Sequence, residues 1–233
     1  MTPGPAPAAE GRPLTLALPK GRTLVPVAAL FARAGVAGLS SAGAPCTVAE
    51  ALLEETRALV RRGVFLGNAV HFLLLKPDDV PTYVDHGTAD LGVCGRDVLL
   101  ERDVDVYHPV DLGLGRCRMV VAGKVGPASP AQAGQMPRVA TKYPRTAADH
   151  FARRGIQVEV VNVQSSVELA PLTGLSDLIV DIVETGATLA QNGLEVKETI
   201  VPISTVLLAN RASYKLRSAL VKPLVEALRS ATA

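Results

Sequence analysis

The residues best suited to chemistry stand in a short polar turn after an apolar stretch. Residues 177–183 read Asp-Leu-Ile-Val-Asp-Ile-Val, and Glu-Thr-Gly-Ala-Thr follows before an amphipathic segment that ends at Asn-Gly. This order predicts a buried strand, a turn and the start of a helix. The first N–H groups of a helix have no partner within it, and a glycine there lets a phosphate approach the backbone closely.

Side chains around this turn would suit a ligand that carries phosphate, sugar hydroxyls and Mg²⁺. Thr185 and Thr188 add two hydroxyl groups, while Asp181 and Glu184 place carboxylates beside the same turn. A purely structural alternative is that Thr185 acts only as the helix N-cap and the acids form a solvated strand end. The local pattern supports both interpretations equally.

A second turn, of opposite charge, lies near the start of the chain. Residues 14–18 are apolar apart from Thr15, which predicts a buried strand, and Pro-Lys-Gly-Arg separates it from a helical pattern that ends at Gly35. Lys20 and Arg22, at the carboxyl end of a strand, suit a phosphate or pyrophosphate. Cations after a strand are also common on protein surfaces, so this turn alone leaves both interpretations open.

The elements that position these turns alternate between strand and helix. Strands are predicted at 70–75, 89–95, 104–112, 117–122, 138–141, 157–163 and 199–209, and helices at 78–86, 96–102, 143–154, 166–172 and 212–229. Residues 38–63 fit neither pattern clearly. The repeated β-α-β order predicts an α/β protein with parallel strands. We expect two sheets, with the chain leaving the first near Val106 and returning near Thr199, and a cleft where the turns at Lys20 and Thr185 face each other.

Composition excludes several classes of protein. The formal net charge is only +2, and 3% of the residues are aromatic, which argues against nucleic acid as a partner. Three cysteines and four scattered histidines lack the spacing of a metal site and fit a reducing cytoplasm. No run approaches the roughly 20 apolar residues of a membrane span. We expect residues 1–12 to form a disordered tail and residues 126–137 a surface connection.

Longer motifs, in a fixed order, carry a resemblance to one enzyme family. They are LALPKGR at 16–22, DDVPTYVDHGTADLGVCGRDVLLE at 78–101, DLGLGRCRMVVA at 111–122, TKYP at 141–144 and SVELAPLTGLSDLIVDIVETGATLAQNGL at 166–194. With these motifs the chain resembles ATP phosphoribosyltransferase, in the short form of its catalytic subunit. They cover most of the chain, and the last of them is highly specific.

This resemblance implies a fold, a reaction and a partner. The fold is a two-domain α/β fold of the type II periplasmic-binding-protein-like class. We expect domain I to cover residues 13–105 and 195–233, and domain II residues 106–194. The reaction joins ATP and phosphoribosyl pyrophosphate (PRPP) to give N1-phosphoribosyl-ATP and pyrophosphate, the first step of histidine biosynthesis. The implied cofactor is Mg²⁺, held mainly by substrate phosphates without dedicated protein ligands. The implied partner is a histidyl-tRNA-synthetase-like regulatory subunit, in a cytoplasmic hetero-octamer.

The resemblance also assigns roles to individual residues. The PRPP-binding set is Asp177, Thr185, Gly186, Ala187 and Thr188, and the set for pyrophosphate or ATP phosphate is Lys20, Gly21, Arg22 and Lys76. The catalytic set is Asp181, Glu184, Lys20 and Arg57. Lys76 stands where the family commonly has arginine, so it keeps the charge but loses the bidentate fork.

The chemistry of this reaction gives the acids a role other than that of general base. N1 of adenine bears no proton, so catalysis depends on positioning and on neutralising the departing pyrophosphate. Asp181 and Glu184 are therefore interpreted as groups that bind the ribose hydroxyls and stabilise positive charge on the sugar. Two other hypotheses remain: a binding module that captures a small anion without chemistry, and a different phosphoribosyltransferase.

Overall fold

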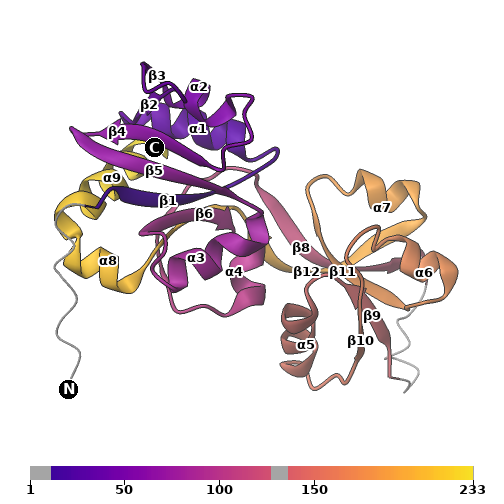
Figure 1. Cartoon of the computed structure of the whole chain (residues 1–233). Coiled ribbons are helices and arrows are strands. Elements are labelled where there is room, and N and C mark those ends of the chain that lie inside the picture. The colour runs from indigo at the N-terminus through magenta and orange to yellow at the C-terminus, as the bar shows by residue number, and fades with distance from the viewer. Residues whose placement is uncertain (1–11, 127–135, 233) are drawn as a thin grey trace. The chain divides into compact units, whose positions relative to one another are not determined.

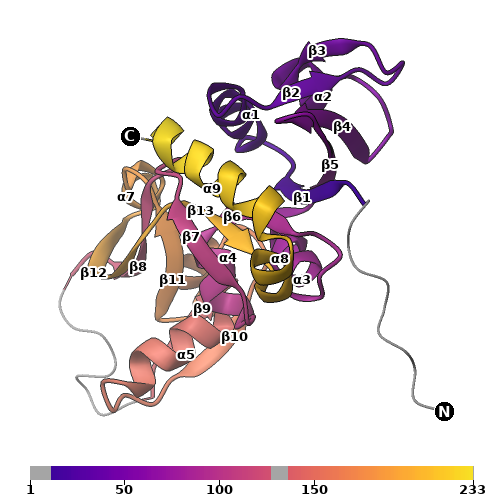
Figure 2. The same cartoon turned by 90° about the vertical axis from the view of Figure 1, so that its left-hand side faces the viewer.

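The computed structural model describes residues 12–126 and 136–232, and these form two compact units. Unit 1 comprises the residues up to Val98, Val104–Leu114 and the residues from Thr205 onward, and unit 2 comprises Leu99–Asp103 and Gly115–Ser204. Each unit is one mixed sheet with helices, as Figures 1 and 2 show. This confirms the predicted α/β class with two sheets.

Unit 1 is organised around an eight-stranded sheet with the strand order β3-β2-β4-β5-β1-β6-β13-β7. Its strands are β1 (Leu14–Pro19), β2 (Ala37–Leu39), β3 (Pro45–Thr47), β4 (Val60–Phe65), β5 (Asn68–Leu75), β6 (Leu91–Gly95), β7 (Tyr107–Asp111) and β13 (Thr205–Ala209). The central strands β5, β1 and β6 are parallel, so their carboxyl ends meet at one edge of the sheet.

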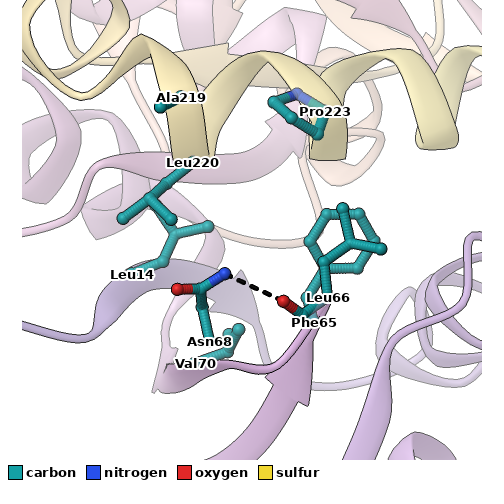
Figure 3. A pocket seen from close by; sticks show the side chains of 8 residues that line it. All are labelled: Leu14, Phe65, Leu66, Asn68, Val70, Ala219, Leu220 and Pro223. Carbon is teal, nitrogen blue, oxygen red and sulfur yellow. Dashed lines mark hydrogen bonds between the residues drawn. The ribbon is translucent and has the colours of Figure 1, made fainter.

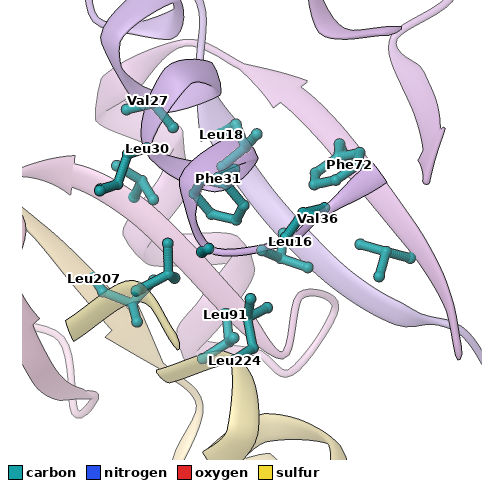
Figure 4. Close-up of a cluster of buried hydrophobic side chains, with 14 of the residues drawn as sticks. Leu16, Leu18, Val27, Leu30, Phe31, Val36, Phe72, Leu91, Leu207 and Leu224 are labelled. Carbon is teal, nitrogen blue, oxygen red and sulfur yellow. The ribbon is translucent and has the colours of Figure 1, made fainter. Parts of the chain in front are cut away.

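Helices cover both faces of this sheet. They are α1 (Leu24–Arg33), α2 (Val48–Leu53), the 3-10 turn η1 (Pro77–Asp79), α3 (Val80–Asp85), α8 (Arg211–Leu216) and α9 (Ser218–Thr232), and α4 (Arg96–Arg102) starts in unit 1 and ends in unit 2. Apolar residues of α1 and α9 join one buried cluster with β1, where Phe31 meets Phe72 edge to face (Figure 4). Within residues 12–126 and 136–232, no helix has the length and apolar character to cross a membrane.

Unit 2 contains a five-stranded sheet with the order β10-β9-β11-β8-β12. Its elements are β8 (Cys117–Lys124), β9 (Arg138–Thr141), α5 (Pro144–Ala152), β10 (Glu159–Asn162), α6 (Leu169–Thr173), β11 (Leu178–Val183), α7 (Ala187–Gln191) and β12 (Leu194–Ile203). Strands β10, β9 and β11 are parallel, while β8 and β12 run antiparallel to their neighbours. Helix α5 packs in the cluster on one face, and α6 and α7 pack in the cluster on the other.

The predicted strand 199–209 is wrong as a single element. It contains the end of β12 and the whole of β13, which belong to different sheets, and Ser204 separates them. Both halves are apolar, so hydrophobic pattern alone does not reveal the change of sheet. As a consequence, unit 2 extends to Ser204, whereas the expected boundary of domain II was residue 194; the earlier boundary lies at Leu114 instead of 105.

The predicted helix 212–229 is likewise two helices. Arg217 leaves the helical conformation, with φ −110° and ψ 29°, and its buried guanidinium reaches the Asp90 carboxylate and the Arg12 carbonyl. Arg12, placed by the sequence in a disordered tail, donates to Asp90 at 2.7 Å. The rest of that predicted tail, residues 1–11, and residues 127–135 of the predicted connection lie outside the described residues.

Candidate active site

The polar turn after β11 has the predicted strand-turn-helix form. Gly186 is the N-cap of α7 and adopts a left-handed conformation with φ 83°, which glycine tolerates best. A Cβ at this position would meet no atom within 4 Å, so the backbone angle, rather than packing, favours glycine here. The Ala187 N–H donates to Thr185 Oγ1 at 3.3 Å. The turn therefore presents a glycine and two exposed threonines at the amino end of α7.

The two acids that the sequence analysis assigned to this turn, Asp181 and Glu184, lie close to it in the fold. Asp181 is the fourth residue of β11 and is partly buried, and its Oδ1 accepts the N–H of Ile182 at 2.8 Å. Ile179 and Val183 pack in the same cluster as Leu189 of α7, and alternation places the Cβ of Asp181 on that face of the sheet. Glu184 is exposed in the turn itself. The structure thus brings both carboxylates to the turn.

Asp177 lies at the opposite end of the same strand. It precedes β11, accepts the Arg138 N–H at 2.8 Å and donates its own N–H to the Arg138 carbonyl at 2.9 Å. The strand between Asp177 and the turn spans roughly 20 Å at 3.3 Å per residue. Asp177 therefore joins the start of β9 to the start of β11, and the structure does not bring it to the other PRPP-binding candidates.

The cationic turn of unit 1 connects β1 to α1. Gly21 has φ 91°, and its carbonyl accepts the Leu24 N–H at 3.0 Å, which closes the turn. The Lys20 N–H donates to the Leu75 carbonyl at 2.8 Å, and Pro19 pairs with Leu75 in the parallel ladder. Lys76, the residue after β5, therefore lies beside Lys20 at the carboxyl edge of the sheet.

Arg57 lies near the carboxyl edge of the unit 1 sheet because β4 pairs with β5, and the sequence did not reveal this pairing. Arg57 is exposed in a bend between α2 and β4. The buried Arg61 guanidinium donates to Glu54 O at 3.0 Å and to Thr56 O at 3.3 Å, two carbonyls just before Arg57. The Leu74 N–H donates to the Leu59 carbonyl at 2.8 Å, so the bend adjoins the carboxyl end of β5. Sequence reasoning missed Arg61, because nothing in its local pattern marks a buried cation.

The cations at this edge have no ion-pair partner among the described residues. Lys20, Arg22, Arg57 and Lys76 are all exposed, and none lies within 4.0 Å of a carboxylate in residues 12–126 and 136–232. Like charges gathered without counter-charges repel each other, and an anionic ligand relieves this repulsion. The carboxyl edge of parallel strands is also where α/β sheets bind their ligands.

Beyond β6, on the other side of β1, sequence reasoning also missed a carboxylate, that of Asp97 in the first turn of α4. A Cβ on Gly95 would lie 2.1 Å from Asp97 Oδ1, so the turn into α4 requires glycine. Burial, together with the charge of Asp97, raises the pKa of the Cys94 thiol. Among the described residues, no group of three or more His, Cys, Asp or Glu side chains is arranged to hold a metal ion.

A small apolar pocket lies at the opposite edge of the unit 1 sheet (Figure 3). It is lined by Leu14, Phe65, Leu66, Asn68, Val70, Ala219, Leu220 and Pro223. Leu14 begins β1 and Asn68 begins β5, so the pocket lies at the amino ends of these strands. It has no charged lining residue and therefore does not suit a phosphate.

Comparisons with known proteins identify the family of this chain. The family model described as HisG, ATP phosphoribosyltransferase, matches residues 76–230. Curated proteins named ATP phosphoribosyltransferase include one from Sorangium cellulosum, 56% identical over 95% of this chain and 97% of that protein, and one from Caldanaerobacter subterraneus, 44% identical over 93% and 96%. The HisG:HisZ complex of Thermotoga maritima contains a chain with 35% identity and a TM-score of 0.77, covering 94% of this chain and 98% of that one. The chain therefore belongs to the ATP phosphoribosyltransferase family.

Proposed function

We propose that this protein transfers the phosphoribosyl group of PRPP to N1 of ATP and releases pyrophosphate, the first step of histidine biosynthesis. Family membership supports the proposal, and the observation that carries it is the Glu-Thr-Gly-Ala-Thr turn at the carboxyl end of β11. A separate cationic edge at the ends of β1 and β5 supplies the second requirement of the reaction, a group of charges for pyrophosphate.

The turn in unit 2 binds the phosphoribosyl end of PRPP. Gly186 and Ala187 present backbone N–H groups to the 5-phosphate, the Ala187 N–H exchanging its 3.3 Å bond to Thr185 Oγ1 for the phosphate, and Thr185 and Thr188 add hydroxyls. Asp181 and Glu184 accept hydrogen bonds from the ribose hydroxyls. The same carboxylates stabilise the positive charge that the ribose gains as its bond to pyrophosphate lengthens.

The reaction exchanges one bond at ribose C1. The C1–O bond to pyrophosphate breaks, the electron pair leaves with that oxygen, and the lone pair of adenine N1 forms the new C1–N bond. N1 has no proton to lose, so no general base is required. Lys20, Arg22, Lys76 and Arg57 offset the negative charge that develops on pyrophosphate.

Magnesium fits this chemistry without a dedicated protein cage. It is a hard cation that prefers oxygen ligands, and PRPP and ATP bring phosphate oxygens while Asp181 and Glu184 add carboxylates beside the turn. We propose that substrate phosphates hold Mg²⁺ for the most part. Bound there, the ion neutralises part of the phosphate charge.

We propose further that the protein acts in the cytoplasm with a histidyl-tRNA-synthetase-like regulatory subunit, in a hetero-octamer. The related Thermotoga maritima structure is a complex of HisG with HisZ, which supports this partner.

Turnover separates this proposal from its competitors. The protein is mixed with ATP, PRPP and Mg²⁺, with and without the regulatory subunit, and phosphoribosyl-ATP is followed by its absorbance and pyrophosphate by a coupled assay. We expect both products in equal amounts. PRPP binding without turnover under either condition supports an anion-binding module, and turnover with another base but not with ATP supports a different phosphoribosyltransferase.

A further inference from the structure

The turn that is proposed to bind PRPP lacks a cation of its own. Between β11 and α7 the chain reads Glu-Thr-Gly-Ala-Thr, and Asp181 adds a second carboxylate on the strand before it. A phosphate dianion brought to this turn meets backbone N–H groups and hydroxyls, but also two negative charges. A positive side chain close to the turn would offset that repulsion.

Lys142 is placed to supply this charge. Strand β9 lies parallel beside β11, and the ladder pairs Ile179 with Ala140 and Val180 with Thr141. One residue further along, Lys142 comes level with Asp181 at the carboxyl edge of the sheet. Lys142 directly follows the last residue of β9, in the bend before α5, and its side chain is exposed.

Buried contacts on both sides fix the backbone of Lys142. The side chain of Thr141 is fully buried, and its hydroxyl donates to Val180 O at 2.6 Å and accepts the Tyr143 N–H at 2.9 Å. Tyr143 is 4% exposed and packs in the cluster under α5. The residue between them is therefore held in place although its own side chain is exposed.

The ammonium group of Lys142 is available for an anion. Nζ lies 4.9 Å from the centroid of the Tyr143 ring, a contact worth less than an ion pair with a phosphate. Within the described ranges, Lys142 has no carboxylate partner within 4.0 Å. A cation that is anchored at its backbone, beside the strand that leads to the turn, and without a carboxylate partner among the described residues suits a ligand of negative charge.

We propose that Lys142 is a binding residue for the 5-phosphate of PRPP, reaching it from strand β9 while the turn before α7 holds it from strand β11. This inference rests on the proposed function. It assigns the lysine of the TKYP motif to the phosphoribosyl end of the substrate, separate from the cations of unit 1.

Calorimetry with ribose 5-phosphate isolates this contact, because that probe carries the 5-phosphate and lacks pyrophosphate. We expect Lys142→Ala to weaken binding of ribose 5-phosphate by roughly 10- to 100-fold, as for loss of a charge-assisted hydrogen bond. Lys142→Arg keeps the charge and should restore most of the affinity. Melting temperatures check that each variant is folded, as the exposure of Lys142 leads us to expect.

Lys124→Ala is the matched control. Lys124 is an exposed lysine of the same unit, but it ends β8, which runs antiparallel to β11, so it lies at the opposite edge of the sheet. Its replacement should leave the affinity unchanged. Equal affinities of the wild type and Lys142→Ala for ribose 5-phosphate would overturn the inference alone, whereas a wild type that binds neither this probe nor PRPP would overturn the proposed function.

Discussion

The hydroxyl of Thr141 donates a hydrogen bond to the carbonyl of Val180 across the parallel strands β9 and β11, with 2.6 Å between the two oxygens. The same hydroxyl accepts the backbone N–H of Tyr143, where β9 turns into α5. One fully buried side chain thus holds the turn after β9 against β11, the strand that leads to the turn at residues 184–188.

Replacement of Thr141 by valine keeps the shape of the side chain and removes both hydrogen bonds. Two buried backbone groups then lose a partner, and we expect a loss of about 1–3 kcal/mol in the free energy of unfolding. Urea denaturation measures this loss. Thr141→Ser, which retains the hydroxyl, is the control and should retain more stability than the valine variant. If the valine variant and the wild type were equally stable, these hydrogen bonds would make no net contribution to the free energy of unfolding.

Gly186→Val should abolish PRPP binding. The left-handed conformation at this position costs a branched residue roughly 1–2 kcal/mol, and the side chain would stand where we propose that the phosphate approaches the backbone. Gly193, at the other end of α7, has φ 66° and also has open space around an added Cβ. Gly193→Val therefore carries similar backbone strain and should bind PRPP normally by calorimetry. Loss of binding in both variants would point to strain in α7 rather than to the phosphate.

Lys20→Ala should lower turnover far more than stability. Lys20 is exposed, so its loss should change the free energy of unfolding by no more than about 0.5 kcal/mol. If it stabilises the departing pyrophosphate, turnover should fall by roughly 10²- to 10³-fold. Lys222→Ala, an exposed lysine on α9, is the control for loss of a surface charge. An unaltered turnover rate for Lys20→Ala would mean that Lys20 is a surface cation without a role in catalysis.

Asp90→Asn should strongly destabilise unit 1. The Asp90 carboxylate is inaccessible and binds Arg217, Arg12, the Ser213 hydroxyl and the Thr15 N–H. Removing its charge leaves the buried Arg217 guanidinium without a counter-charge, which typically costs about 3–5 kcal/mol. Asp105→Asn, which breaks the exposed pair with Arg211, should change stability little. Thermal unfolding of the two variants compares a buried with an exposed ion pair.

Stability should fall at alkaline pH through Cys94. The pKa of this thiol is raised in the folded state by burial and by Asp97, while an unfolded cysteine titrates near pH 8.5, roughly. Below that pH both states keep the proton. Above it only the unfolded state releases the proton, so stability is lost at up to ~1.4 kcal/mol per pH unit. Urea titrations at pH 7.5 and 9.5 measure the free energy of unfolding at each pH. Between these two values it should fall less for Cys94→Ala than for the wild type.

The two turns were predictable because their signals are local. An apolar run, a polar turn with glycine and an amphipathic segment follow one another within a few residues at both Lys20 and Thr185. The positive φ angles of Gly21 and Gly186 agree with that pattern. The family resemblance then supplied the ligand, since local pattern alone left a structural alternative for each turn.

The positions of residues that depend on pairing between distant strands were not predictable from local sequence. Arg57 lies near the carboxyl edge of the unit 1 sheet because β4 pairs with β5, and Asp177 lies away from the turn at residues 184–188 because it precedes β11. The split of residues 199–209 between two sheets has the same origin. Neighbours in the sheet, and not neighbours in the chain, decide where such residues act.

The position of β13 has a consequence for the order in which the protein is completed during synthesis. This strand pairs with both β6 and β7, yet it follows every strand of unit 2 in the chain. On the ribosome, the sheet of unit 2 is therefore complete at residue 203, while the sheet of unit 1 still lacks an inner strand. Unit 2, with the turn before α7, can therefore fold first, whereas unit 1 completes its sheet only after β13 has been synthesised.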